Sequence, residues 1–273
     1  MIRRPPIPAL QPFVKESWAA DSTGSSAESR PGDREHVLPT GSMHLVFRLT
    51  SDPLKVYRQT GEAGGISYGP VVIGGVRSVY YIRDISRPTR SVGVLLKPGV
   101  SEWLFGSHSD EFSHRHTCVD LVWGREAELI REQLSELSQV RQLAMVESWL
   151  ARRLSVADAP SQVMVDALKR LEARETIRSV VEYSGYSHRH FNALFRRFVG
   201  LTPKAYSRIL QFQRLVDRLK YSPQQSMAEI ALEAGYSDQA HCSRHFLATA
   251  GITLSEYRRL APQFHRHVKL PST

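Results

Sequence analysis

Residues 230–257 read IALEAGYSDQAHCSRHFLATAGITLSEY, and this stretch decides the fold of the C-terminal region. A related stretch, VVEYSGYSHRHFNALFRRFVGLTPKAY, occupies residues 180–206. Both contain Gly-Tyr-Ser, then a phenylalanine, a glycine, a threonine and a tyrosine in the same order. The offset between the copies is 50 residues at Gly-Tyr-Ser and 51 from the phenylalanine onward, so the second copy has one extra residue. Two copies predict a duplicated supersecondary unit rather than a solenoid.

Each copy has the layout of a helix-turn-helix. A short helix is predicted to end just before Gly185 or Gly235, because glycine adopts the left-handed conformation that a tight turn requires. Ser187 and Ser237 then lie where the N-cap of a second helix belongs. A plain helical hairpin needs the same stop and start signals. Two copies within a basic region favour a DNA-binding arrangement instead.

Most of the excess positive charge lies in this same region. The chain of 273 residues has a net charge of +9, and residues 161–273 hold 17 Lys and Arg against 9 Asp and Glu. This asymmetry indicates a polyanionic partner, although charge alone also fits a merely cationic surface. The helix predicted between the copies, residues 203–221, is about 28 Å long at ~1.5 Å per residue. A rod of that length holds two reading helices roughly one DNA turn, ~34 Å, apart.

Residues 161–262 resemble the DNA-binding domain of AraC/XylS-type transcription regulators. The resemblance rests on Ile230-Ala231, Gly235-Tyr236-Ser237-Asp238, Ser243-Arg244, Phe246, and Gly251-Ile252-Thr253 ahead of Tyr257. It implies two helix-turn-helix units joined by a long helix, with the third and sixth helices of the domain reading bases. It also implies RNA polymerase as a partner.

The resemblance places base-reading side chains on the second helix of each unit. They are His188, Arg189, Asn192 and Ala193 in the first unit and Gln239, Ala240, Ser243 and Arg244 in the second. The chemistry agrees for four of them, because arginine pairs bidentately with guanine and Asn or Gln pairs with adenine. Three further cations suit phosphate better than bases: Arg196, Arg197 and Lys204.

The N-terminal half has a different pattern of residues. Short β-rich runs in residues 40–100 are separated by glycine and proline, which predicts a small antiparallel barrel or sandwich. Two apolar stripes, in residues 126–137 and 140–154, predict amphipathic helices that cover a face of the barrel or pair two chains. The segment 37–47, together with Leu96-Lys97-Pro98-Gly99 and Val122-Trp123-Gly124, resembles the N-terminal domain of one subgroup of these regulators. That resemblance implies a cupin-like barrel that serves as a sensor or dimerisation module.

The predicted architecture is therefore α+β, with a small N-terminal β-barrel and flanking helices followed by an all-α domain. The expected parts are a sensor or dimerisation domain (1–154), a linker (155–160), a double helix-turn-helix domain (161–262) and a tail (263–273). No apolar stretch follows the first arginines, so we expect no secretory signal, and no uncharged apolar run approaches the ~18 residues of a membrane span. Two cysteines exclude a disulfide framework and a Cys-based zinc finger, which favours the cytoplasm.

The function expected from these patterns is sequence-specific recognition of double-stranded DNA by a non-enzymatic transcription regulator that needs no cofactor and no membrane. The N-terminal domain is expected to sense a small-molecule effector or to form a homodimer. Aromatic side chains are candidates to line its effector pocket, foremost among them Tyr57, Tyr80 and Trp103.

The alternative is a metal-dependent cupin-type enzyme fused to a DNA-binding module. Its candidate ligands are His108, His114 and His116 with Asp110 and Glu111 between them, and more distantly His36 and His44. The three close histidines lie on a polar segment without a metal-binding period, so a surface cluster is the simpler interpretation. The sequence contains no nucleophile elbow, phosphate loop or dinucleotide fingerprint.

Overall fold

The computed structural model describes residues 1–23, 30–154, 161–222, 224–260 and 266–269. Its strands are β1 (Ile2–Arg4), β2 (Val14–Asp21), β3 (Arg34–Val37), β4 (Met43–Arg48), β5 (Leu54–Tyr57), β6 (Ile66–Tyr68), β7 (Val71–Gly74), β8 (Tyr81–Asp84), β9 (Arg90–Leu96), β10 (His116–Cys118) and β11 (His267–Lys269). Its α-helices are α1 (Ser101–Phe105), α2 (Asp120–Trp123), α3 (Arg125–Ser135), α4 (Gln139–Arg153), α5 (Gln162–Glu172), α6 (Ile177–Ser184), α7 (His188–Val199), α8 (Pro203–Tyr221), α9 (Met227–Glu233), α10 (Gln239–Ala250) and α11 (Leu254–Leu260). Two 3₁₀ turns are η1 (Pro8–Leu10) and η2 (Ser109–Phe112).

The N-terminal strands form two antiparallel sheets. One has the order β1-β2-β9-β4-β7-β10 and the other β11-β3-β8-β5-β6. Antiparallel sheets followed by a helical region confirm the mixed α and β composition. The described strands do not form the single closed barrel that was expected, because neither sheet closes on itself. The two sheets meet instead through their side chains, as where the rings of Tyr81 (β8) and His116 (β10) approach to 4.7 Å.

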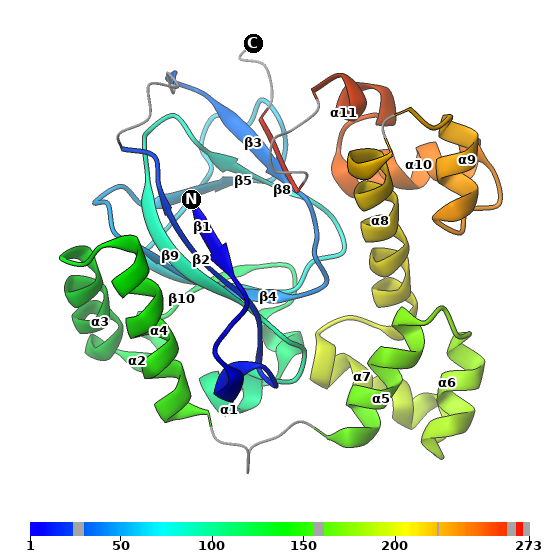
Figure 1. Cartoon of the computed structure of the whole chain (residues 1–273), viewed down its shortest axis with the longest axis horizontal. Coiled ribbons are helices and arrows are strands. Elements are labelled where there is room, and N and C mark those ends of the chain that lie inside the picture. Colours follow the sequence, from blue (N-terminus) through cyan, green and yellow to red (C-terminus); the bar gives the residue numbers. More distant parts are fainter. Residues whose placement is uncertain (24–29, 155–160, 223, 261–265, 270–273) are drawn as a thin grey trace.

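Alternation along β4 sets the two faces of the six-stranded sheet. Leu45 and Phe47 are fully buried on one face, whereas His44 and Val46 point to the other. The helices α3 and α4 cover the first face, where the Trp149 ring lies edge-on to Phe47 at 6.2 Å. Figure 1 shows α3 and α4 on the side of this sheet away from the C-terminal helices. Most of the two amphipathic stripes therefore covers a sheet face, whereas Leu129 and Val140 are exposed.

The C-terminal region consists of two helix pairs, α6–α7 and α9–α10, joined by the long α8 (Figure 1). The first pair matches its expected signals. Ser187 caps α7 by accepting a hydrogen bond from the His190 backbone N–H at 3.3 Å, and Gly185 has φ +71°.

The second pair corrects one expected cap. Asp238, not Ser237, caps α10, because its carboxylate accepts from the His241 N–H at 2.6 Å. The extra residue of the second copy thus falls in the turn, between Tyr236 and the start of α10. An aspartate is also the stronger cap for the positive end of the helix dipole.

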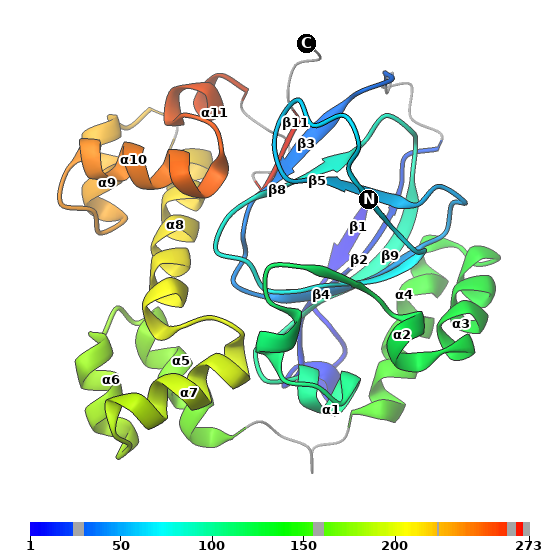
Figure 2. The ribbon, with the colours of Figure 1, turned by 180° about the vertical axis from the view of Figure 1, so that it is seen from behind.

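Part of the segment expected to be a tail rejoins the N-terminal half. Strand β11 pairs antiparallel with β3, with Val268 opposite His36. Figure 2 shows β11 beside β3, across the molecule from α6. Val268 is fully buried, so the strand contributes to the core. The expected linker, residues 155–160, lies outside the described residues.

Candidate nucleic-acid interface

The helix α7 separates its apolar and polar faces cleanly. Phe191 and Phe195 are fully buried and anchor the helix to the core. The expected base-reading residues of the first unit lie on the opposite face, and all are exposed: His188, Arg189, Asn192 and Ala193. A helix anchored on one face and exposed on the other has the form that enters a major groove.

The helix α10 repeats this arrangement. Cys242 and Phe246 are fully buried. The expected base-reading residues of the second unit again lie opposite: Gln239, Ala240 and Arg244 are exposed, and Ser243 is half-buried. Tyr236 packs into the crook of the pair and its hydroxyl lies 2.8 Å from His245 Nδ1. Burial lowers the pKa of His245, so this imidazole is a neutral structural partner rather than a cation facing DNA.

A hollow of about 660 Å³ is lined both by a candidate base-reading residue and by candidate phosphate-binding residues of the first unit. Asn192, Arg196, Arg197 and Lys204 all line it. The N-terminal half borders the same hollow through Asp110. His108 contacts the Arg197 guanidinium, so one expected phosphate-binding residue is engaged within the molecule.

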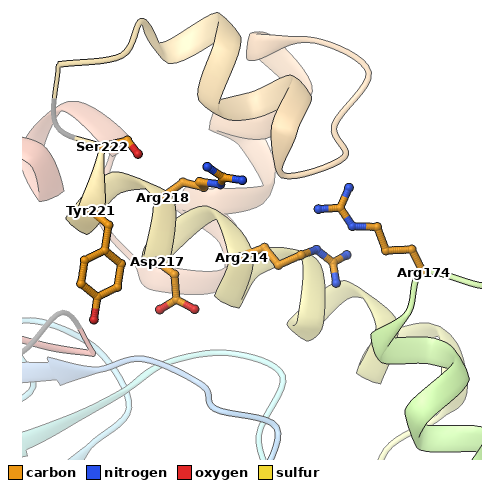
Figure 3. Close-up of a pocket in the computed structure, with 6 residues that line it drawn as sticks. All are labelled: Arg174, Arg214, Asp217, Arg218, Tyr221 and Ser222. Carbon is orange, nitrogen blue, oxygen red and sulfur yellow. The ribbon is translucent and has the colours of Figure 1, made fainter.

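A second pocket, of about 280 Å³, lies along α8 and reaches Arg174, which follows α5 (Figure 3). Arg174, Arg214 and Arg218 line it. Arg174 has φ +68°, a conformation that costs a non-glycine residue free energy, and its guanidinium donates to the Glu233 carbonyl at 3.0 Å. Arg218 lies 3.1 Å from the Glu233 carboxylate. Arg174 and Arg218 therefore connect the turn after α5 and the last turn of α8 to Glu233 at the end of α9.

The N-terminal half holds the C-terminal end of α7. The hydroxyls of Ser109 and Ser113 donate to the carbonyls of Phe198 and Gly200 at 2.7 and 2.5 Å, and the Gly99 N–H donates to Phe198 at 3.0 Å. The last carbonyls of a helix have no partner within the helix, so the N-terminal half satisfies groups that α7 leaves open.

The end of α10 is held in the same way. His36 Nδ1 lies 2.9 Å from the Ala250 carbonyl, and the Tyr80 N–H donates to the Thr249 carbonyl at 2.9 Å. The ring of Tyr80 lies directly under Gly251. Both candidate reading helices thus end on the N-terminal half. We call these contacts the clamp: Gly99, Ser109 and Ser113 hold the end of α7, and His36 and Tyr80 hold the end of α10. No sequence pattern predicts the clamp, because serines in loops and glycines at helix ends also occur without such contacts.

The expected effector-pocket residues are not brought together. Tyr57 is buried, with its hydroxyl bonded to Asp84 at 3.0 Å and Arg34 over its ring. Tyr80 contacts the end of α10, and Trp103, which lies in α1, packs against the core.

The metal candidates are also dispersed. His44 and His116 approach each other, with ring centroids 6.0 Å apart, whereas His108 contacts Arg197 and His36 contacts Ala250. Among the described residues there is no group of three or more His, Cys, Asp or Glu side chains placed to hold a metal ion. No described helix is both long enough and apolar enough to cross a membrane.

Comparison with known proteins identifies the C-terminal region. Residues 180–260 match the family described as a helix-turn-helix domain. The resemblance to AraC/XylS-type regulators is thereby confirmed for this region. Residues 2–118 match a family described as a domain of unknown function (DUF6597).

A curated relative and several solved structures are also similar. An uncharacterized HTH-type transcriptional regulator of Haemophilus influenzae is 31% identical over 83 residues, which are 30% of this chain and 28% of that protein. The chain thus matches less than a third of that relative's length. A structure of ToxT from Vibrio cholerae has a TM-score of 0.48 at 9% identity, covering 89% of this chain and 96% of that one. Wild-type ToxT with a bound unsaturated fatty acid has a TM-score of 0.46 at 12% identity, covering 89% and 94%.

Proposed function

We propose that this chain is a cytoplasmic transcription regulator that recognises specific sites in double-stranded DNA through α7 and α10. The proposal places two helix-turn-helix units within residues 161–262 and a regulatory domain within residues 1–154. One observation carries it: two helices with buried aromatic faces expose arginine and amide side chains at the two ends of a 19-residue rod. Guanine and adenine edges are the partners of those side chains in a major groove.

The N-terminal half is proposed to control how the two reading helices are presented. Its hydrogen bonds to the ends of α7 and α10 make their positions depend on its own conformation. Asp110 also lines the candidate DNA-binding hollow, and His108 contacts Arg197, so the His108 side chain competes with phosphate for this guanidinium. A small molecule or a second chain that alters the N-terminal half would therefore alter DNA binding.

The test is binding of the full chain to the DNA flanking its own gene and to a scrambled control, at two salt concentrations. Selective binding that weakens with salt is expected, since cationic side chains displace counterions from phosphate. Equal affinity for both DNAs at each salt concentration would contradict sequence-specific recognition by this chain.

Arg244→Ala is expected to weaken binding to the selected site by about 1–3 kcal/mol and to relax discrimination at the base it reads. Arg244 is exposed on α10, and the proposal assigns its guanidinium to a base edge. Arg141→Ala removes the same charge from an exposed position on α4 and is expected to leave affinity nearly unchanged. If Arg244→Ala weakens specific and scrambled DNA equally, the side chain contacts phosphate and not a base.

A further inference from the structure

A pair of histidines faces the space between the two sheets. In the register of the six-stranded sheet, Gly74 lies directly between His44 of β4 and His116 of β10. Cross-strand neighbours share a face, so both imidazoles project from the same side. A Cβ atom on Gly74 would come within 2.0 Å of His44 Nε2, so only glycine leaves room for this ring. Tyr81 of the five-stranded sheet approaches His116 from the opposite side.

The protonation of His116 follows from its partner. Arg77 Nη2 lies 2.9 Å from His116 Nδ1, and because a guanidinium only donates, Nδ1 must accept. The imidazole is therefore neutral with its proton on Nε2. Burial, with Arg77 nearby, lowers the pKa of His116 to about 2 and that of His44 to about 3, which keeps both rings neutral at pH 7.

Two donors at this place have no acceptor among the described residues. They are His116 Nε2 and Arg77 Nε, and both atoms are buried. His116 itself is 5% exposed. An unmade hydrogen bond to a buried donor costs roughly 1–3 kcal/mol, and more for a charged group, so a native chain rarely leaves such donors unpaired.

The charge of Arg77 is also uncompensated. Burial lowers its pKa, and the groups that counter this effect are the hydroxyls of Tyr81 and Tyr68, not a carboxylate. Glu35, the carboxylate between the sheets, is already engaged by Arg83 and by His267 Nδ1 at 2.9 Å. Within the described structure, the guanidinium of Arg77 thus has no anion of its own.

The surrounding side chains still border open space. Arg83 pairs with Glu35 between the sheets, yet 33% of its side-chain surface is accessible. His44, Tyr68 and Tyr81 likewise keep partial accessibility although they point between the sheets. Leu54, Val56 and Val72 add an apolar wall next to the two tyrosines.

We propose that the space between the two sheets binds a small organic carboxylate, with Arg77 Nε and His116 Nε2 donating to its oxygens. The carboxylate supplies the acceptors and the negative charge that this place lacks, and Tyr68, Tyr81 and the apolar wall enclose the rest of the ligand. The ligand's role as effector rests on the proposed function, whereas the binding itself does not.

The test uses the purified full chain and calorimetry at pH 7 without DNA. The probes are acetate, propionate and hexanoate, each compared with its neutral amide, and inorganic phosphate. We expect saturable binding of at least one carboxylate below about 50 mM, within the millimolar range typical of small ligands, and no binding of its amide. Equal binding of acid and amide, a preference for phosphate, or no saturation by any carboxylate would overturn the proposal.

Variants locate the site. Arg77→Met is expected to weaken carboxylate binding by roughly tenfold or more, and Arg58→Met, which removes an exposed charge from the end of β5, leaves it unchanged. Arg77→Lys retains the charge but not the two-pronged geometry and is expected to fall between them. Unchanged affinity in Arg77→Met would overturn the assignment. A chain that binds selected DNA but no carboxylate refutes this inference alone, and one that binds the carboxylate but no DNA refutes the proposed function alone.

Discussion

Gly200→Ala and Gly251→Ala are each expected to release one reading helix from the N-terminal half. Both glycines have positive φ values, +88° and +72°, so alanine costs about 1–2 kcal/mol in backbone strain at either position. A second cost comes from the clamp. A Cβ atom on Gly200 would lie 2.5 Å from Val76 and 2.7 Å from the Ser113 hydroxyl, and one on Gly251 would lie 2.2 Å from the Tyr80 ring.

This second cost has matched controls in the same repeat. Gly185 and Gly235 also have positive φ values, but a Cβ atom there meets nothing closer than 3.7 Å. Alanine at these positions is therefore expected to cost the backbone strain alone. We expect overpacking to lower the free energy of unfolding of the Gly200→Ala and Gly251→Ala variants by a further ~1–3 kcal/mol. Alternatively, the helix end moves away from the N-terminal half and the steric clash is relieved.

Urea unfolding measures the stability loss, and small-angle scattering measures the undocking as an increase in the radius of gyration. The clamp variants are expected to expand and the Gly185→Ala and Gly235→Ala controls to stay compact. If all four variants lose the same free energy of unfolding and none expands, the ends of α7 and α10 are not held by the N-terminal half in solution.

Glu35→Gln is expected to destabilise the chain by about 3 kcal/mol or more at pH 7. Burial alone would raise the pKa of Glu35, but Arg83 and His267 outweigh it and hold the pKa at about 2. Glutamine leaves the guanidinium of Arg83 between the sheets without its counter-charge, which is the costly way to break a buried pair. The glutamine amide oxygen can still accept from His267 Nδ1, but this hydrogen bond loses its charge assistance, so the contact between β11 and β3 weakens.

The pH dependence gives an independent check. A carboxyl whose pKa is lowered on folding stabilises the protein above its unfolded value, and this contribution is lost as the pH falls. For Glu35 the loss is expected between about pH 4.5 and pH 2. Glu35→Gln should lack this part of the acid transition. Glu16→Gln breaks an exposed pair with Arg3 at 3.0 Å and is expected to cost less than about 1 kcal/mol. Equal losses for the two variants would contradict the buried pair.

The helical region was predictable because its signals are local. Glycine after α6, a serine cap before α7 and aromatic residues at helical spacing each act within one or two turns, so the order of helices follows from the sequence. The one-residue offset between the copies was also visible. Its consequence, the transfer of the cap from Ser237 to Asp238, was not, because either side chain satisfies the preference for a cap.

The N-terminal half was less predictable, since strands depend on partners far away in the chain. Strand β2 carries Lys15 and Glu16 next to buried Val14, so its sequence has no apolar run, and pairing with β1 and β9 defines it. The three residues of β11 are too short for a periodic signal and form a strand because β3 offers them an edge.

The sequence by itself determined the repeat, the helix boundaries and the polar faces of α7 and α10, because helix periodicity and caps are encoded within a few neighbouring residues. Only the tertiary structure decided that both helices end on the N-terminal half, that β11 returns to β3, and that His44, Gly74 and His116 align beside Arg77. Those arrangements join residues up to 232 positions apart, as in the contact of Glu35 with His267. These arrangements depend on long-range packing and on the burial of charged groups, and no local sequence pattern predicts either effect.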